Sequence, residues 1–333
     1  MSSAAPATGA RGASSARASA RPASIDPALR GNAADILRGA SRSEWPALRA
    51  HALECAAHDA SLLRELAPRG LADDNRGVRF VACMAVAEAR AADLGDLVQP
   101  LLADDSGSVR AAAMLALARA GRKVDLSPLA TLVQANDPEV RANTYLVLGE
   151  LGNPSAVPLI VESLGRGLSL VNPIRARLVD LAAAEALVKL GQETEIEPIR
   201  AALFTPPEEA ELSIVACDAL GRLRDERSRD MLERIVTVDG PAKRAPELRL
   251  AAAKALIQIG SRSERPLAVA REYAADPDPR IRAQVASVLG ALRTAEAAGL
   301  LATLVVDADP TVKVSAAGGM AAIQASAASA EGG

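Results

Sequence analysis

The two histidines are the first residues in this sequence that could do chemistry. His51 and His58 are the only histidines of the chain, seven positions apart with Glu54 between them. On a helix this spacing can bring the three side chains to one face, where they could contact a metal ion. A metal site needs at least one further ligand and an enclosed position, and the sequence supplies neither. We therefore expect solvent-exposed histidines and no bound metal.

The cysteines offer no better candidate for a reactive group. Cys55, Cys83 and Cys217 are isolated, odd in number and never in a C-x-x-C spacing. This pattern argues against a disulfide framework and favours small buried hydrophobes in a reducing compartment. The sequence also has no phosphate-binding loop, nucleophile elbow or zinc-protease motif. It therefore predicts no catalytic residue and no cofactor, and indicates that the chain is not an enzyme.

Composition restricts the function further. Half of the 333 residues are hydrophobic but only 2% are aromatic, and the formal net charge is −3. A mildly acidic chain has no excess of positive charge to attract nucleic acid, and no 18-residue apolar stretch could cross a membrane. Residues 1–24, rich in Ala, Ser and Arg, and residues 325–333 are expected to be disordered tails. We expect a soluble, cytoplasmic protein.

One segment recurs along the chain and predicts the elements that position these residues. Clear copies are VRAAAMLALARAG from Val109, VRANTYLVLGELG from Val140, LRLAAAKALIQIG from Leu248 and IRAQVASVLGALR from Ile281. Nine copies follow one another at spacings of 30 to 39 residues, which is typical of a helix-turn-helix unit in a repeat protein. Within each copy the apolar residues have the 3.6-residue period of a helix. A shorter apolar segment precedes each copy and predicts a second helix.

The turn between the two helices carries the residues that begin a helix. Asp-Pro occurs there at Asp137, Asp278 and Asp309, each followed by a copy of the recurrent segment. An Asp side chain can accept hydrogen bonds from the first free backbone amides, and Pro suits the first helical turn. We interpret these aspartates first of all as helix caps.

The D-P-x-V-R turn followed by A-x-x-A-L-x-x-L-G resembles the HEAT-like repeats of bacterial proteins, the short kind named after the phycobilisome lyases. The resemblance covers residues 25–324. It implies an all-α fold, a right-handed α-solenoid of about nine helical hairpins. It says almost nothing about function, because a fold carries no site by itself.

The same resemblance implies a ladder of ion pairs between neighbouring repeats. In such arrays the Asp of the turn commonly pairs with the basic residue that follows the first apolar position of the recurrent segment. The residues concerned here are Asp137, Asp278 and Asp309 with Arg79, Arg110, Arg141, Arg249, Arg282 and Lys313. Asp180 and Ser213 replace the basic residue in the fifth and sixth repeats, where the spacing is also longest. We expect the weakest seam of the array there.

Enzymes with this kind of repeat provide alternatives to a binding role. Deoxyhypusine hydroxylase holds iron with His-Glu dipeptides, and this chain contains none. DNA glycosylases of this type need a cationic, aromatic groove, which five aromatic residues in a mildly acidic chain do not make. Trp45 is instead expected to pack over the end of the first repeat. An enzyme or accessory factor of the bilin-lyase kind stays open, because its site is not marked by a short motif.

The helical wheel places three positions of each recurrent segment away from the core, on the concave side of the array. We predict that they bind a protein partner, and in chain order the main candidates are Val81, Met84, Glu88, Leu115, Arg119, Asn143, Leu146, Glu150, Glu185, Lys189, Asp218, Arg222 and Lys254. The stripe begins at His51, Glu54 and His58. Its apolar part could form an exposed contact strip or could be ordinary inter-repeat core.

Together these patterns favour a non-catalytic scaffold or adaptor that binds a protein partner along the concave surface. The alternatives are a bilin-lyase-like factor and, less favoured, a nucleic-acid binder. The identity of the partner is not contained in the sequence.

Overall fold

The structure is a computed structural model in which residues 25–166, 171–240 and 243–331 are described. Over these residues the fold is all-α, with 18 α-helices and no β-strand. The tail predicted at residues 1–24 lies outside the described residues. Within the described part no helix is long and apolar enough to cross a membrane.

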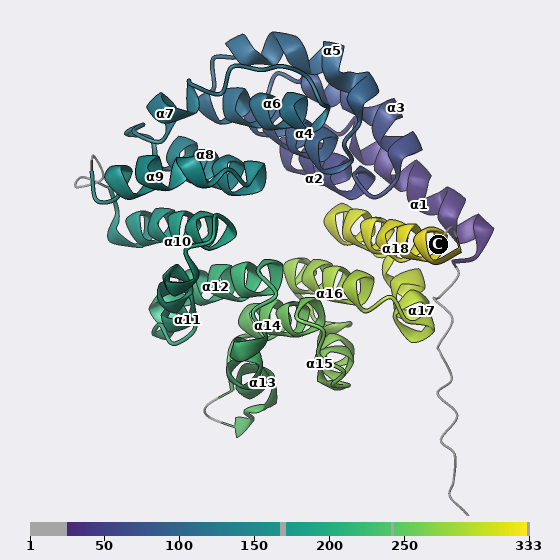
Figure 1. Cartoon of the computed structure of the whole chain (residues 1–333). Helices are drawn as coiled ribbons and strands as arrows, with labels where there is room; N and C mark the ends of the chain where they lie inside the picture. Colours follow the sequence, from purple (N-terminus) through teal and green to yellow (C-terminus); the bar gives the residue numbers. More distant parts are fainter. Residues whose placement is uncertain (1–24, 167–170, 241–242, 332–333) are drawn as a thin grey trace, which may run out of the picture.

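The helices form nine pairs, as the repeats predict, and the recurrent segment is the second helix of each pair. These second helices line the inside of the structure (Figure 1). They are α2 (Pro46–Ala56), α4 (Arg76–Glu88), α6 (Gly107–Arg119), α8 (Pro138–Leu151), α10 (Pro173–Lys189), α12 (Ala210–Arg222), α14 (Pro246–Gln258), α16 (Pro279–Leu292) and α18 (Pro310–Glu331). We call them the inner helices.

The first helices of the pairs lie outside the inner layer. They are α1 (Pro27–Ala40), α3 (Ala60–Leu71), α5 (Gly95–Val98), α7 (Leu129–Leu132), α9 (Val157–Ser163), α11 (Ile196–Ala202), α13 (Arg229–Thr237), α15 (Arg265–Tyr273) and α17 (Ala295–Leu304). Short 3₁₀ turns extend several pairs, namely η1 (Ala92–Leu94), η2 (Gln99–Ala103), η3 (Pro154–Ala156), η4 (Glu193–Glu195), η5 (Pro207–Glu209) and η6 (Glu226–Ser228).

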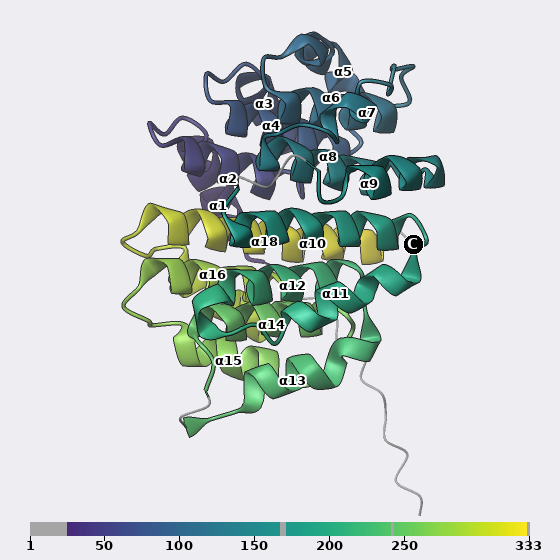
Figure 2. The ribbon, with the colours of Figure 1, turned by 90° about the vertical axis from the view of Figure 1, so that its left-hand side faces the viewer.

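The solenoid closes on itself, which the sequence does not predict. The last helix, α18, packs against α16 on one side and against α1 and α2 on the other, so the ninth repeat contacts the first (Figure 1). Every inner helix therefore has two inner neighbours, and the nine form a continuous ring. Figure 2 gives a second view of this ring, with α10, α12 and α18 crossing the view. The inner helices, which would form the concave surface of an open array, therefore enclose a lumen.

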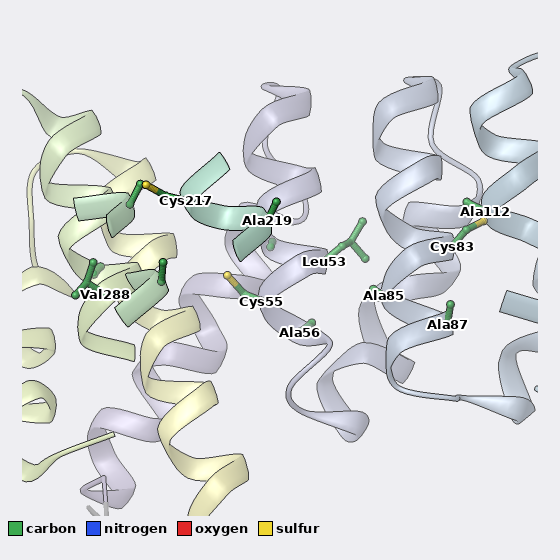
Figure 3. Packing of buried hydrophobic residues seen from close by; sticks show 14 of the residues in the cluster. Leu53, Cys55, Ala56, Cys83, Ala85, Ala87, Ala112, Cys217, Ala219 and Val288 are labelled. Carbon is green, nitrogen blue, oxygen red and sulfur yellow. The ribbon is translucent and has the colours of Figure 1, made fainter. Parts of the chain in front are cut away.

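Glycines allow the inner helices at the closing end to approach closely. A Cβ on Gly290 of α16 would lie 2.6 Å from the Cα of Gly319 on α18. A Cβ on Gly318 would lie 2.2 Å from the Sγ of Cys55 on α2. Figure 3 shows Cys55 among the buried residues of α2. Only a residue without a side chain fits at these contacts, so the two adjacent glycines of α18 make the closure possible.

The predicted end of the solenoid at residue 324 falls inside a helix. Helix α18 continues to Glu331, and the expected disordered tail at 325–333 is therefore helical up to that residue. The segment is mostly Ala and Ser. Ala has the highest intrinsic helix propensity, so a short Ala-rich extension can continue a helix that is already anchored by packing.

Ion pairs tie the repeats together, but with different carboxylates from those expected. Arg79 forms two hydrogen bonds to the Asp104 carboxylate, of 2.7 and 2.9 Å, and donates a third, of 2.8 Å, to the carbonyl oxygen of Asp73. Arg49 pairs in the same way with Asp73 and Arg282 with Asp307. Each arginine thus links the turn of its own repeat to the turn of the next.

The aspartates predicted for this ladder, Asp137, Asp278 and Asp309, are helix caps instead. Each accepts a hydrogen bond from a backbone amide two residues later. Where the ladder forms in these turns, its carboxylate belongs to the residue two positions before the cap, as Asp307 does before Asp309. The prediction of their role in the ladder was therefore wrong.

The ladder is also incomplete. Arg110 donates only to the carbonyls of Asp104 and Asp105, because Ala135 stands where the next repeat would supply a carboxylate. Arg141 is 1% exposed and donates to the carbonyl oxygens of residues 135, 163 and 166. Arg249 pairs with Glu272 rather than with an aspartate of the turn. For Lys313 no ion pair is formed within the described ranges.

Arg79 and Arg110 form a matched pair for testing the ladder. Replacing Arg79 by Gln should lower the free energy of unfolding by about 2 kcal/mol, because it leaves the 6% exposed Asp104 carboxylate without its cation. Replacing Arg110 by Gln should cost about 1 kcal/mol, because only hydrogen bonds to carbonyls are lost. Urea unfolding of both variants checks this, and equal losses would contradict the importance of the carboxylate.

The effect of the Arg79 variant should depend on pH. Burial raises the pKa of Asp104, but the hydrogen bonds from Arg79 and from the Ser106 amide outweigh it and hold that pKa below its ordinary value. A carboxyl group with a lowered folded-state pKa stabilises the protein above its unfolded pKa, about 3.9, and this contribution is lost as the pH falls through the folded value. The difference between native chain and variant should therefore shrink below about pH 4.

Candidate functional site

Part of the predicted concave stripe faces the lumen. A cavity of about 820 Å³ is bounded by α2, α4, α12, α14, α16 and α18. Its wall includes the stripe residues His51, Glu54, His58, Glu88, Asp218, Arg222 and Lys254. A smaller cavity of about 170 Å³, between α8, α10 and α12, is lined by the stripe residues Asn143, Leu146, Glu185, Lys189 and Arg222. The helical wheel thus identified the inward face of these helices.

Many charged residues of the stripe pair with one another. Arg119 on α6 forms an ion pair with Glu150 on α8, and Lys189 on α10 reaches the same carboxylate at 2.9 Å. Lys189 also lies 3.0 Å from Glu185, which pairs with Arg222 on α12 at 2.7 Å. This chain of charges crosses four inner helices. It fixes their positions instead of leaving them free for a partner.

The pairing offsets the burial of the carboxylates. Burial alone would raise the pKa of Glu185, but the hydrogen bonds from Arg222 and the charge of Lys189 outweigh it and lower that pKa. For Glu150, the bonds from Lys189 and Arg119 likewise outweigh burial and lower the pKa. Both groups therefore remain ionised inside the ring at neutral pH.

The expectation of an exposed apolar strip is wrong at its centre. Leu115 is 0% exposed and belongs to the core. Val81 and Met84 are partly buried and pack against that core, and Leu146 is partly buried at the smaller cavity. Helix α6 packs against α4 and α8 on either side and against the outer elements of its repeat, and Leu115 belongs to this packing. The alternative interpretation, ordinary core, applies to Leu115.

The predicted solvent exposure of the histidines is correct for only one of the two. His58 is exposed, as expected, but His51 is partly buried in the cavity. Burial lowers the pKa of His51, and the positive charge of Lys254 on α14 lowers it further, while Glu54 acts in the opposite direction. Among the described residues, no three His, Cys, Asp or Glu side chains are placed to hold a metal ion.

The exposed apolar side chains lie mainly at one edge of the ring. Seven large hydrophobic residues are exposed in the described ranges, and five of them lie in turns between an outer and an inner helix of one pair: Trp45, Leu164, Phe204, Val238 and Val306. Each inner helix is entered from such a turn, so the turns recur along the same edge. We call these five residues the turn rim. The other two, Leu97 and Val161, lie on outer helices.

The turn rim was not predicted from the sequence, and the expected position of Trp45 is wrong. Trp45 was expected to pack over the end of the first repeat, but it is 71% exposed. The ninth repeat occupies that end, so no open surface is left for Trp45 to cover. The available signal was the presence of large apolar residues inside otherwise polar turns, as in Val306-Asp307.

Comparison with solved structures finds distant likenesses. They include the complex of CpcE and CpcF of phycocyanin lyase from Nostoc sp. PCC7120, at 18% identity over 72% of this chain and 92% of that chain, with a TM-score of 0.43. Human deoxyhypusine hydroxylase matches at 16% identity over 78% and 94%, with a TM-score of 0.36. An engineered protein matches at 17% identity over 88% of both chains, with a TM-score of 0.32. These likenesses are too remote to indicate a function.

No curated protein matches the chain. The sequence profile of HEAT repeats, in contrast, matches residues 63–144, 94–172 and 242–321, which together are more than half of the chain. The described residues of these ranges belong to the second to fifth and the seventh to ninth helical pairs of the ring. The protein is therefore a member of the HEAT-repeat family.

Proposed function

We propose that this protein is a non-catalytic scaffold that binds a protein partner at the turn rim. The observation that carries the proposal is the gathering of exposed apolar side chains there. Trp45 and Val306 are each 71% exposed and Phe204 is 58% exposed. In a chain with only one Trp and two Phe, two of these three aromatic residues lie in the turns before inner helices.

The arrangement along the ring favours two contact areas. Leu164, Phe204 and Val238 belong to three successive repeats, and Val306 and Trp45 belong to the ninth and first repeats, which closure makes neighbours. Exposed apolar side chains gathered on one surface usually mark a contact with another protein. Trp is the residue most often found to dominate binding energy, and Trp and Phe are both enriched at interfaces.

The lumen suits a folded partner less well than the rim. Its larger cavity, about 820 Å³, has the size of a small-molecule site. Four stripe residues on the opposite side, Arg119, Glu150, Glu185 and Lys189, are engaged in the ion pairs described above. We therefore place the protein partner on the rim instead of along the concave surface. We also infer a cytoplasmic location, with which the three unpaired cysteines agree.

Affinity capture from the source cell tests this proposal with matched variants. Trp45→Ser combined with Phe204→Ser should weaken capture of a specific partner about tenfold or more, because interface aromatics carry most of the binding energy. Leu97→Ser combined with Val161→Ser removes apolar groups of comparable exposure from outer helices and should leave capture unchanged. Both double variants should melt close to the native chain, since exposed residues contribute little to stability.

Two results would contradict the proposal. One is capture that survives the rim variant, and the other is capture that both double variants weaken equally. A partner protein whose recovery disappears when Lys254 or Asp218 is replaced would instead place binding in the lumen.

A further inference from the structure

Eight ionisable side chains that line the larger lumen cavity form no hydrogen bond or ion pair within the described chain. His58, Glu88, Arg224 and Arg293 are exposed at or just beyond helix ends, and the other four lie within the inner helices. His51 and Glu54 approach it from α2, Asp218 from α12 and Lys254 from α14. None of the four side chains takes part in a hydrogen bond or an ion pair with the rest of the described chain. The neighbouring stripe residues Glu185 and Arg222, in contrast, satisfy each other.

The unpaired groups lie close enough to influence one another across the ring. The charge of Lys254 acts on His51 of α2 and on Asp218 of α12. Burial raises the pKa of Asp218, and Lys254 and Arg222 only partly oppose this shift. Asp218 and Lys254 are partly buried, whereas Glu54 is exposed at the cavity. Partly buried charges without partners are unfavourable, and a ligand with complementary charges would remove that cost.

The facing wall leaves room for such a ligand. Helices α16 and α18 contribute only small side chains to it, namely Ser287, Gly290, Ala291, Ser315, Gly318, Gly319 and Ala322, apart from Arg293 at the end of α16. The volume of about 820 Å³ lies within the range of small-molecule sites. The position of Arg224 and Arg293 just beyond the ends of α12 and α16, both exposed, indicates that the cavity opens at that edge.

We propose that the lumen binds a small zwitterion, with the ligand's carboxylate on Lys254 and its ammonium group on Asp218 and Glu54. A ligand carrying only a carboxylate would leave the two acids without a cation, and one carrying only an ammonium group would leave Lys254 without an anion. An uncharged ligand would offer none of these groups an opposite charge. This site lies on a different surface from the turn rim, and the proposal does not depend on the protein partner.

A series of ω-amino acids tests the site, because its members differ only in the distance between the two charges. Glycine, β-alanine, γ-aminobutyrate, aminopentanoate and aminohexanoate are titrated calorimetrically into the full chain at low ionic strength. At least one should bind, with a preferred charge separation. The alkylamine and the carboxylate of the same length should bind about tenfold or more weakly, because each loses one charged hydrogen bond.

The affinity of single-residue variants for the preferred probe shows whether it binds in the lumen cavity. Lys254→Met and Asp218→Asn should each reduce affinity for the preferred probe about tenfold or more. Lys123→Met makes the same change at an exposed lysine outside the cavity and should bind as the native chain does. The Trp45→Ser, Phe204→Ser variant should also bind normally, which separates this site from the rim. Thermal melts confirm that Asp218→Asn is folded, because removing an unpaired charge should not destabilise the ring.

The proposal is overturned if no member of the series binds. It is equally overturned if an amine or a carboxylate alone binds as tightly as the zwitterion of its length. Unchanged affinity in Lys254→Met would show that any binding occurs elsewhere on the protein.

Discussion

Replacing Gly318 by valine should open the ring between the first and ninth repeats. A Cβ at this position would lie 2.2 Å from the Sγ and 2.9 Å from the Cβ of Cys55, and the short cysteine side chain cannot move far on a packed helix. Helix α18 would then no longer pack closely against α2. We expect a lower melting temperature, by an overpacking cost of about 1 to 3 kcal/mol, and a larger radius of gyration in X-ray scattering.

Gly299 provides the matched control for this substitution. It also lies within a helix, α17, but a Cβ there meets nothing within 4 Å. Gly299→Val should leave the radius of gyration unchanged and the melting temperature close to that of the native chain. An unchanged scattering profile for Gly318→Val would mean that α18 does not close the ring through this contact.

Replacing Leu115 by glutamate should unfold the repeats around α6. The side chain is 0% exposed, so the substitution would bury a carboxylate without a partner. Such a change costs about 4 kcal/mol or more, a large fraction of the stability of a domain. Circular dichroism and urea unfolding should show a loss of helical signal or a strongly reduced midpoint.

The control for this prediction is the same chemical change at an exposed leucine. Leu97 on α5 is 47% exposed, and Leu97→Glu should change stability by less than about 0.5 kcal/mol. If Leu115→Glu were as stable as Leu97→Glu, Leu115 would be accessible from solvent. The sequence-based expectation of an apolar contact strip would then be restored.

The local structure could be predicted because it depends on neighbouring residues. The recurrent apolar period identified the nine inner helices, and the helical wheel identified their inward face, which now lines the lumen. The sparsest packing between neighbouring inner helices, that of α10 with α12, also lies between the fifth and sixth repeats, where the sequence predicts the weakest seam. Asp180 and Ser213 replace the ladder arginine in these two repeats, and whether the ring bends there stays a prediction.

Closure could not be predicted because it is a long-range property. The Sγ of Cys55 lies 3.8 Å from the carbonyl oxygen of Val314, a residue 259 positions away in the sequence. Whether two such residues meet depends on the sum of small rotations between nine repeats, and no single repeat encodes that sum. The adjacent glycines Gly318 and Gly319 can be seen in the sequence. Their role in close packing depends on α2 and α16, which lie next to them only in the folded ring.

The errors in the site have different origins. Leu115 was expected on an exposed concave face but lies in the packing of α6 against neighbouring helices, whereas Trp45 was expected to pack over the end of the first repeat, which assumes an array with open ends. In the ring Leu115 is core and Trp45 is exposed. The ladder error is local in origin: the cap aspartates and the ladder aspartates are two positions apart in the same turn, and the spacing alone does not distinguish them.

The alkylation rate of Cys55 in the unmodified chain tests ring closure most directly. Burial against α18 raises the pKa of its thiol, which is 8% exposed at the lumen cavity. Cys83 and Cys217, each 0% exposed, serve as internal controls. Peptide mapping after alkylation should find all three thiols much slower in the native protein than in denaturant. Alkylation of Cys55 alone in the native protein at nearly its rate in denaturant would show an open solenoid and contradict the closed ring.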